Sequence, residues 1–145
     1  MALPPRPVDA PDIPAGSVGL VVNGGLMRGM RAHHRLLAAG AAFVREVRTA
    51  PVFRLWSIGD RYPGMVRASS GGASLAAELY AVPRAGFAAV VEGEAEGLCV
   101  GRVPLDDGTA PLGVLIEPRM TEGMAEITAH GGWRAYVEAK GIPQT

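Results

Sequence analysis

Glycine and proline break this chain into short apolar pieces, and this division limits its fold more than any other feature. Among the 145 residues, 20 are glycine and 12 are proline, and they recur between runs rich in Val, Leu and Ala. A short apolar run that ends at Gly or Pro is typical of a buried strand. Many short strands, few helices and frequent turns predict a β-rich α+β domain with a small closed or half-closed sheet.

The apolar runs also locate the expected elements. Short helices are predicted at residues 31–39 and 84–91, and a last helix begins near Gly132. Residues 60–64 (DRYPG) form a predicted turn. The predicted strands are residues 18–23, 42–49, 52–57, 65–68, 74–82, 98–103 and 112–117.

The two ends of the chain differ from its middle in composition. Residues 1–16 contain five prolines and are expected to form a flexible arm. Residues 17–140 are expected to form a single domain, and residues 141–145 a tail. The sequence shows neither a signal peptide nor an apolar run of membrane-spanning length, so we expect a cytoplasmic protein, of bacterial origin.

Charge and metal-ligating residues exclude several classes of function. The formal net charge is zero, whereas nucleic-acid binding calls for a basic excess. Cys99 is the only cysteine, which excludes an internal disulfide and a four-cysteine zinc site, and its apolar run predicts a buried thiol. His33, His34 and His130 do not have metal-ligand spacing. We therefore expect no metal site and no cofactor.

A family resemblance rests on several stretches that occur in a fixed order. They are VVNGGLMRGM (21–30), REVRTAPVFRLWSI (45–58), PGMVR (63–67), GGASLAAELYAVP (71–83), LCVGRVPLDDG (98–108) and EITAHGGWRAY (126–136). In this order they resemble the C-terminal domain of allophanate hydrolase, over about residues 18 to 138. The closing Gly-Gly-Trp-Arg-x-Tyr motif is the most specific of them.

This resemblance implies the gamma-glutamylcyclotransferase-like fold, a small mixed β-barrel with flanking helices. In that group a loop after the first strand presents backbone N–H groups to a substrate carboxylate. Its counterpart here, and the predicted substrate-binding segment, is Asn23, Gly24, Gly25 and Leu26. Glycine lets a backbone approach a ligand closely, and consecutive N–H groups attract anions. The alternative is a plain glycine turn.

Two acids are candidates for catalysis. Glu78 lies in AELY, which is similar to the Gly-Glu-x-Tyr strand of the same group, and burial there would raise its pKa for acid–base chemistry. The alternative is an outward-facing charge or a structural partner for an arginine. Glu92 follows the second helix, where a cyclotransferase usually carries its catalytic Glu. Its alternative is a solvated acidic loop with Glu94 and Glu96.

Two arginines are candidates for holding a ligand carboxylate. Arg54 lies between apolar residues of a predicted strand, and Arg67 ends the PGMVR segment. A planar guanidinium can bind a carboxylate through two parallel hydrogen bonds. The alternative for both is an internal salt bridge with Glu78 or Glu117.

Two classes of function remain in competition. The resemblance implies decarboxylation of an N-carboxycarbamate-type compound, or cyclotransfer of gamma-glutamyl groups. The competing hypothesis is a non-catalytic binding or assembly module, favoured by departures from the family pattern at Leu26, residues 30–34 and residues 92–97. The expected partners are a small carboxylate-bearing ligand and either an amidase subunit or a second copy of the chain, with no nucleic acid and no membrane.

Overall fold

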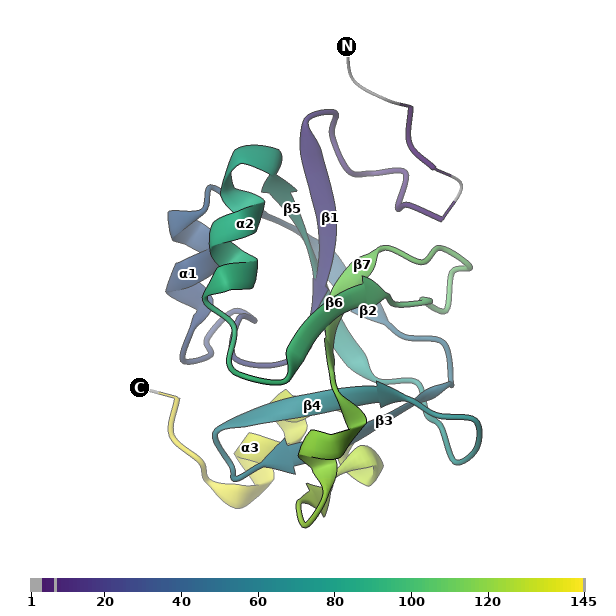
Figure 1. Ribbon diagram of the computed structural model, residues 1–145, viewed down its shortest axis with the longest axis vertical. Helices are drawn as coiled ribbons and strands as arrows, with labels where there is room; N and C mark the ends of the chain where they lie inside the picture. Colours follow the sequence, from purple (N-terminus) through teal and green to yellow (C-terminus); the bar gives the residue numbers. More distant parts are fainter. Residues whose placement is uncertain (1–3, 7, 145) are drawn as a thin grey trace.

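Two β-sheets form the frame of the structure, a computed structural model that describes residues 4–6 and 8–144 (Figure 1). The larger sheet has five strands in the order β2-β5-β1-β7-β6, and the smaller has three in the order β4-β3-β8. The larger sheet consists of β1 (Ser17–Val22), β2 (Ala42–Arg48), β5 (Ala76–Pro83), β6 (Leu98–Arg102) and β7 (Leu112–Ile116). The smaller consists of β3 (Phe53–Ile58), β4 (Tyr62–Arg67) and β8 (Ala125–Glu126).

Among the residues that the structure describes, three short α-helices flank the sheets. They are α1 (His33–Ala38), α2 (Arg84–Glu92) and α3 (Trp133–Lys140), and single 3₁₀ turns cover Pro118–Thr121 and Thr128–His130. Figure 1 shows α1 and α2 together on one side of the larger sheet, and α3 beside the β3–β4 hairpin. In the described part of the chain, none of the helices is long and apolar enough to cross a membrane.

Strand β1 lies at the centre of the larger sheet and makes it mixed. It pairs antiparallel with β5 and parallel with β7. Leu20, Val21 and Val22 are fully buried. A central strand that is covered on both faces favours a continuous apolar run, as this one has. The predicted α+β class, with a mixed sheet and flanking helices, is confirmed.

The strand pairings of the described residues do not close the sheet into a barrel. Instead, β4 of the smaller sheet packs across β7 of the larger one. Gly64 permits this approach, since a Cβ atom at that position would lie 2.6 Å from the Ile116 side chain. The fold therefore joins two open sheets by packing, where the resemblance implied a small mixed β-barrel.

The turn between β3 and β4 is tighter than the sequence predicted. Gly59 and Asp60 both have positive φ, and β4 already begins at Tyr62, within the predicted turn. The Ser57 hydroxyl donates to the Asp60 carboxylate at 2.6 Å and accepts its backbone N–H at 3.0 Å, which supports this conformation. The hydroxyl of Tyr136, on α3, also donates to the Asp60 carboxylate, and this hydrogen bond links α3 to the turn.

The described part of the N-terminal arm lies against the larger sheet. Ala10 is buried, and Asp9 forms an ion pair with Arg102 at 2.6 Å. The backbone N–H of Ala110 donates to Val8 O at 2.5 Å. These contacts hold the arm beside β6 and the segment that precedes β7.

Cys99 is exposed, and the prediction of a buried thiol is wrong. The residue lies on β6, the last strand in the order of the larger sheet. Side chains of a strand alternate between its two faces, and an apolar run does not reveal which face is covered on an edge strand.

Candidate functional site

A glycine loop, residues 23–30, follows β1 at the end where β1 and β7 run parallel. Asn23 is 5% exposed, and its Nδ2 donates to Val114 O at 2.9 Å, which continues the link between the two strands beyond their last pair. Ligands of open α/β sheets often bind outside the carboxyl ends of parallel strands. The loop therefore begins at a favourable place for a ligand.

Each carbonyl of the next three residues is engaged within the protein. Gly24 O accepts the N–H of Met27 at 3.0 Å, and Gly25 O accepts that of Ala32 at 2.8 Å. Leu26 O lies 2.9 Å from His33 Nδ1, which must carry the proton because a carbonyl only accepts. The matching N–H groups of Gly24, Gly25 and Leu26 donate to no acceptor among the described residues. Because the carbonyl groups are engaged and the N–H groups are not, the loop offers three consecutive hydrogen-bond donors to an anion.

The glycine loop and three other segments line a cleft of about 190 Å³. The other segments are the residues that lead into α1, the β3–β4 turn and the residues after α2. The cleft wall includes Arg31, Arg35 and Arg61, and Glu94 is the one acid among its described lining residues. This excess of positive charge suits an anionic ligand.

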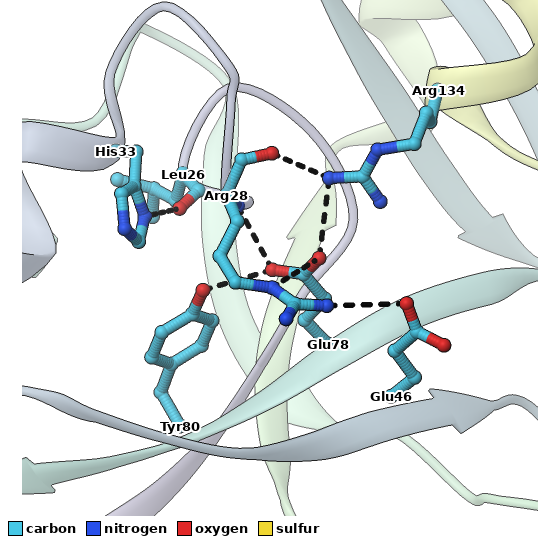
Figure 2. Close-up of polar contacts among 7 residues, drawn as sticks. All are labelled: Leu26, Arg28, His33, Glu46, Glu78, Tyr80 and Arg134. Atoms are coloured by element: carbon cyan, nitrogen blue, oxygen red, sulfur yellow. Dashed lines mark hydrogen bonds and ion pairs between the residues drawn. The ribbon is translucent and has the colours of Figure 1, made fainter.

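Glu78 lies on β5 behind the loop, and its carboxylate is 1% exposed. Oε1 accepts the backbone N–H of Arg28 at 2.9 Å and the hydroxyl of Tyr80 at 2.8 Å. Oε2 accepts Arg28 Nε at 3.3 Å and Arg134 Nη2 at 3.2 Å. Figure 2 shows these donors around the carboxylate, which thus binds the loop to β5 and α3.

The pKa of Glu78 lies below its ordinary value, so the expected rise is wrong. Burial raises the pKa of this carboxyl, but the Arg28 backbone N–H, the Tyr80 hydroxyl and the charges of Arg134 and Arg28 together outweigh burial. The same carboxylate raises the pKa of the Tyr80 phenol, to which burial contributes most. Glu78 is therefore an ionised anchor whose four donors are already in place.

Arg134 connects the closing sequence motif to the glycine loop. Its Nη2 donates both to Glu78 Oε2 and to the backbone oxygen of Arg28 (Figure 2). Arg28 also forms an ion pair with Glu46 at 3.1 Å and lies over the ring of Phe43. The Gly-Gly-Trp-Arg-x-Tyr motif thus holds the loop from the far end of the chain.

The other predicted site residues lie elsewhere. Arg54 forms a bidentate ion pair with Glu126, and Arg67 is exposed on β4, so neither contacts Glu78 as the alternative proposed. Neither arginine lines the cleft. Glu92 is exposed at the end of α2 and also lies outside the cleft.

Glu94, grouped in the sequence with a solvated loop, lies instead in the cleft wall. Its side chain is 12% exposed. Burial raises its pKa more than the charge of Arg35 and its hydrogen bond lower it. Sequence spacing gave no signal for this residue, because three glutamates alternate with small residues and only the packing of α2 decides which one turns inward.

Close packing at Gly24 leads to a testable difference from its neighbour. A Cβ atom at Gly24 would lie 2.5 Å from Pro63 Cδ, whereas one at Gly25 would meet Ala32 at an ordinary 3.6 Å. We expect Gly24→Ala to lower the free energy of unfolding by about 1–3 kcal/mol. Gly25→Ala should stay near wild type in urea denaturation, and equal losses in the two variants would contradict the packing argument.

The fold places the chain in a wider class of α+β proteins. An AIG2-like protein from Mus musculus has the same fold, with a TM-score of 0.56 at 19% identity over 72% of this chain and 78% of that one. This class is the gamma-glutamylcyclotransferase-like fold that the resemblance implied.

The family is shown by a direct match. The model of the allophanate hydrolase C-terminal domain matches residues 18–138, and the chain belongs to that family, which confirms the prediction from sequence. The protein c4763 of uropathogenic E. coli is 47% identical with a TM-score of 0.82, covering 84% of this chain and 96% of that one.

Two larger relatives contain a similar domain. Kluyveromyces lactis allophanate hydrolase is 27% identical with a TM-score of 0.81, over 86% of this chain and 21% of that one. Urea amidolyase of Saccharomyces cerevisiae is 29% identical over 132 residues. That match covers 86% of this chain, and the chain spans only 7% of the amidolyase.

Proposed function

We propose that the chain binds a small dianion of the N-carboxycarbamate type in the cleft and promotes the loss of CO₂ from it. The observation that carries this proposal is the set of three consecutive N–H groups, at Gly24, Gly25 and Leu26, without an acceptor in the described structure. Since the carbonyls of the same residues are engaged, the loop offers only donors to a ligand.

The charges around the cleft support a ligand with two carboxylates. The N–H groups hold one carboxylate, and the guanidinium groups of Arg31 and Arg61, which come from two different segments of the wall, attract the second. The Arg31 guanidinium also donates to Pro143 O at 3.0 Å through Nη2. The cleft of about 190 Å³ suits a compound of a few heavy atoms rather than a peptide.

The names of the larger relatives support the chemical class. One relative is an allophanate hydrolase and another a urea amidolyase. When an amidase removes ammonia from allophanate, N-carboxycarbamate remains, and its loss of CO₂ gives carbamate. An amidase is therefore the proposed source of the ligand and the proposed partner of this chain.

Malonate tests the site because a CH₂ group replaces the NH of N-carboxycarbamate in an otherwise similar dianion. A ligand present at 100 times its Kd stabilises a protein by about 2.7 kcal/mol, which raises the unfolding temperature by several degrees. We expect this shift with malonate and a loss of affinity in Arg61→Gln. Arg67→Gln, on an exposed arginine outside the cleft, is the matched control.

Other outcomes of this experiment would redirect the proposal. A shift with a gamma-glutamyl amine but not with malonate would favour cyclotransfer. A loss of binding in Arg67→Gln but not in Arg61→Gln would place the ligand outside the cleft. No shift with any small carboxylate would contradict the proposal and leave the assembly module as the better hypothesis.

A further inference from the structure

Glu94 differs from the two glutamates that surround it in the sequence. Glu92 and Glu96 are exposed, with 83% exposure for the Glu96 side chain, whereas the Glu94 side chain is 12% exposed and lines the cleft. Glu78, the other buried acid of this region, has its four donors in place and does not line the cleft. Glu94 is thus the carboxyl group that a bound ligand would meet.

The arginine beside Glu94 is largely committed to another partner. Arg35 Nη2 donates to Val90 O at 2.6 Å, at the carboxyl end of α2, where a cation is favourable. Gly93 makes room for the guanidinium, because a Cβ atom there would lie 2.3 Å from Nη2. The contact of Arg35 Nη1 with Glu94 Oε1 is long, at 3.4 Å. Glu94 is therefore only partly compensated, in keeping with its raised pKa.

We propose that Glu94 is the proton donor of the cleft and protonates the nitrogen of the bound compound as CO₂ leaves. This inference rests on the proposed function, because it takes the N-carboxycarbamate-type dianion as the ligand. It adds the group that supplies the proton, which neither the loop N–H groups nor the arginines deliver at neutral pH.

The step needs no reactant besides the bound compound and water. The carboxyl proton of Glu94 passes to the nitrogen while the C–N bond to the departing carboxylate breaks. The electron pair of that bond stays on nitrogen and forms the new N–H bond, the carboxylate leaves as CO₂, and carbamate remains. Water then returns a proton to Glu94. General acid catalysis of this kind contributes about 10²–10⁴-fold to a rate.

The charged and titratable groups that share the cleft with Glu94 come from two segments. Arg31 and Arg35 lie before and within α1, and Arg61 and Tyr62 lie at the β3–β4 turn. The described lining residues include no second acid. Burial favours the neutral form of the Glu94 carboxyl group, whose pKa is raised despite the nearby Arg35 guanidinium. A dianion therefore meets arginines and this carboxyl group, and the carboxylate form of Glu94 would repel it.

The experiment compares malonate binding across pH in wild type, Glu94→Gln and the exposed control Glu92→Gln. We expect wild type and Glu92→Gln to lose malonate affinity, measured by calorimetry, as pH rises and Glu94 ionises. Glu94→Gln should lack that loss, because glutamine does not ionise. Titration of malonate itself affects all three proteins equally, so a difference between them reports on Glu94. Release of CO₂ from N-carboxycarbamate, formed in place by an amidase acting on allophanate, should fall at least 100-fold in Glu94→Gln alone.

The outcomes separate this inference from the proposed function. Malonate binding with the same pH dependence in wild type and Glu94→Gln would overturn the role of Glu94 and leave the site intact. Unchanged CO₂ release in Glu94→Gln would overturn it equally. Failure of malonate to bind wild type would count against the proposed function itself. The thermal unfolding curve of Glu94→Gln shows whether the variant is folded.

Discussion

Replacement of Glu78 by glutamine should lower the free energy of unfolding by about 2–3 kcal/mol. Glutamine keeps the size of the side chain but loses the charge. Its NH₂ group replaces one of the two oxygens that accept hydrogen bonds, so two donors then face each other. Arg28 and Arg134 are partly exposed, so water can solvate their guanidinium groups in the variant. The loss of stability therefore stays below that expected for a fully buried ion pair. Urea denaturation measures the difference.

Glu46→Gln is the matched control, because it removes a second carboxylate from the same arginine. The Glu46 side chain is 75% exposed, and a surface pair of this kind contributes little. We expect a loss of at most about 0.5 kcal/mol. Similar losses in Glu46→Gln and Glu78→Gln would show that burial and the four donors of Glu78 contribute nothing.

The effect of Glu78 on stability should depend on pH in one direction. Its pKa is lower in the folded chain than in the unfolded one, so folding favours the ionised form. The stabilisation is complete above the unfolded-state pKa of about 4.3, decreases as pH falls, and is lost below the folded-state pKa. Wild type and Glu78→Gln should differ most at neutral pH and converge in acid. A difference that stays constant down to pH 3 would contradict this account.

The sequence revealed the elements whose signals are local. The apolar run of β1 and the glycines after it predicted a strand and a loop, and the closing motif predicted the family. Trp133 and Tyr136 lie three residues apart, a spacing that places both on one face of a helix, and both are buried. Each of these signals lies within a few neighbouring residues.

The partners of Glu78 are not local, and the sequence did not show them. Arg28 and Arg134 are 50 and 56 residues away from Glu78 in the chain. Arg54 and Arg67 were the arginines predicted as partners instead, because strand alternation gives the face of a residue but not its neighbour on another element. The expected rise in the pKa of Glu78 failed for the same reason, since burial was predicted without the donors that accompany it.

Trp133→Ala should have the largest effect on stability of any change considered, a loss of about 3–5 kcal/mol. The indole is 1% exposed and packs against Tyr136, so its removal leaves a cavity where α3 meets the sheets. Trp133→Phe should lose far less. It keeps most of the ring and removes a buried Nε1–H that has no acceptor among the described residues. Equal losses in the two variants, measured by urea denaturation, would contradict a packing role.

Arg134→Gln distinguishes the anchoring of α3 from its action on the glycine loop. Arg134 is partly exposed and contacts the loop at Arg28 O, so its loss should affect the loop more than the core. We expect a small change in stability and about tenfold weaker malonate binding, which is about 1.4 kcal/mol. Trp133→Phe, which leaves Arg134 in place, should bind malonate as wild type does. Wild-type affinity in Arg134→Gln would mean that Glu78 and Arg28 position the donors of the loop without help from α3.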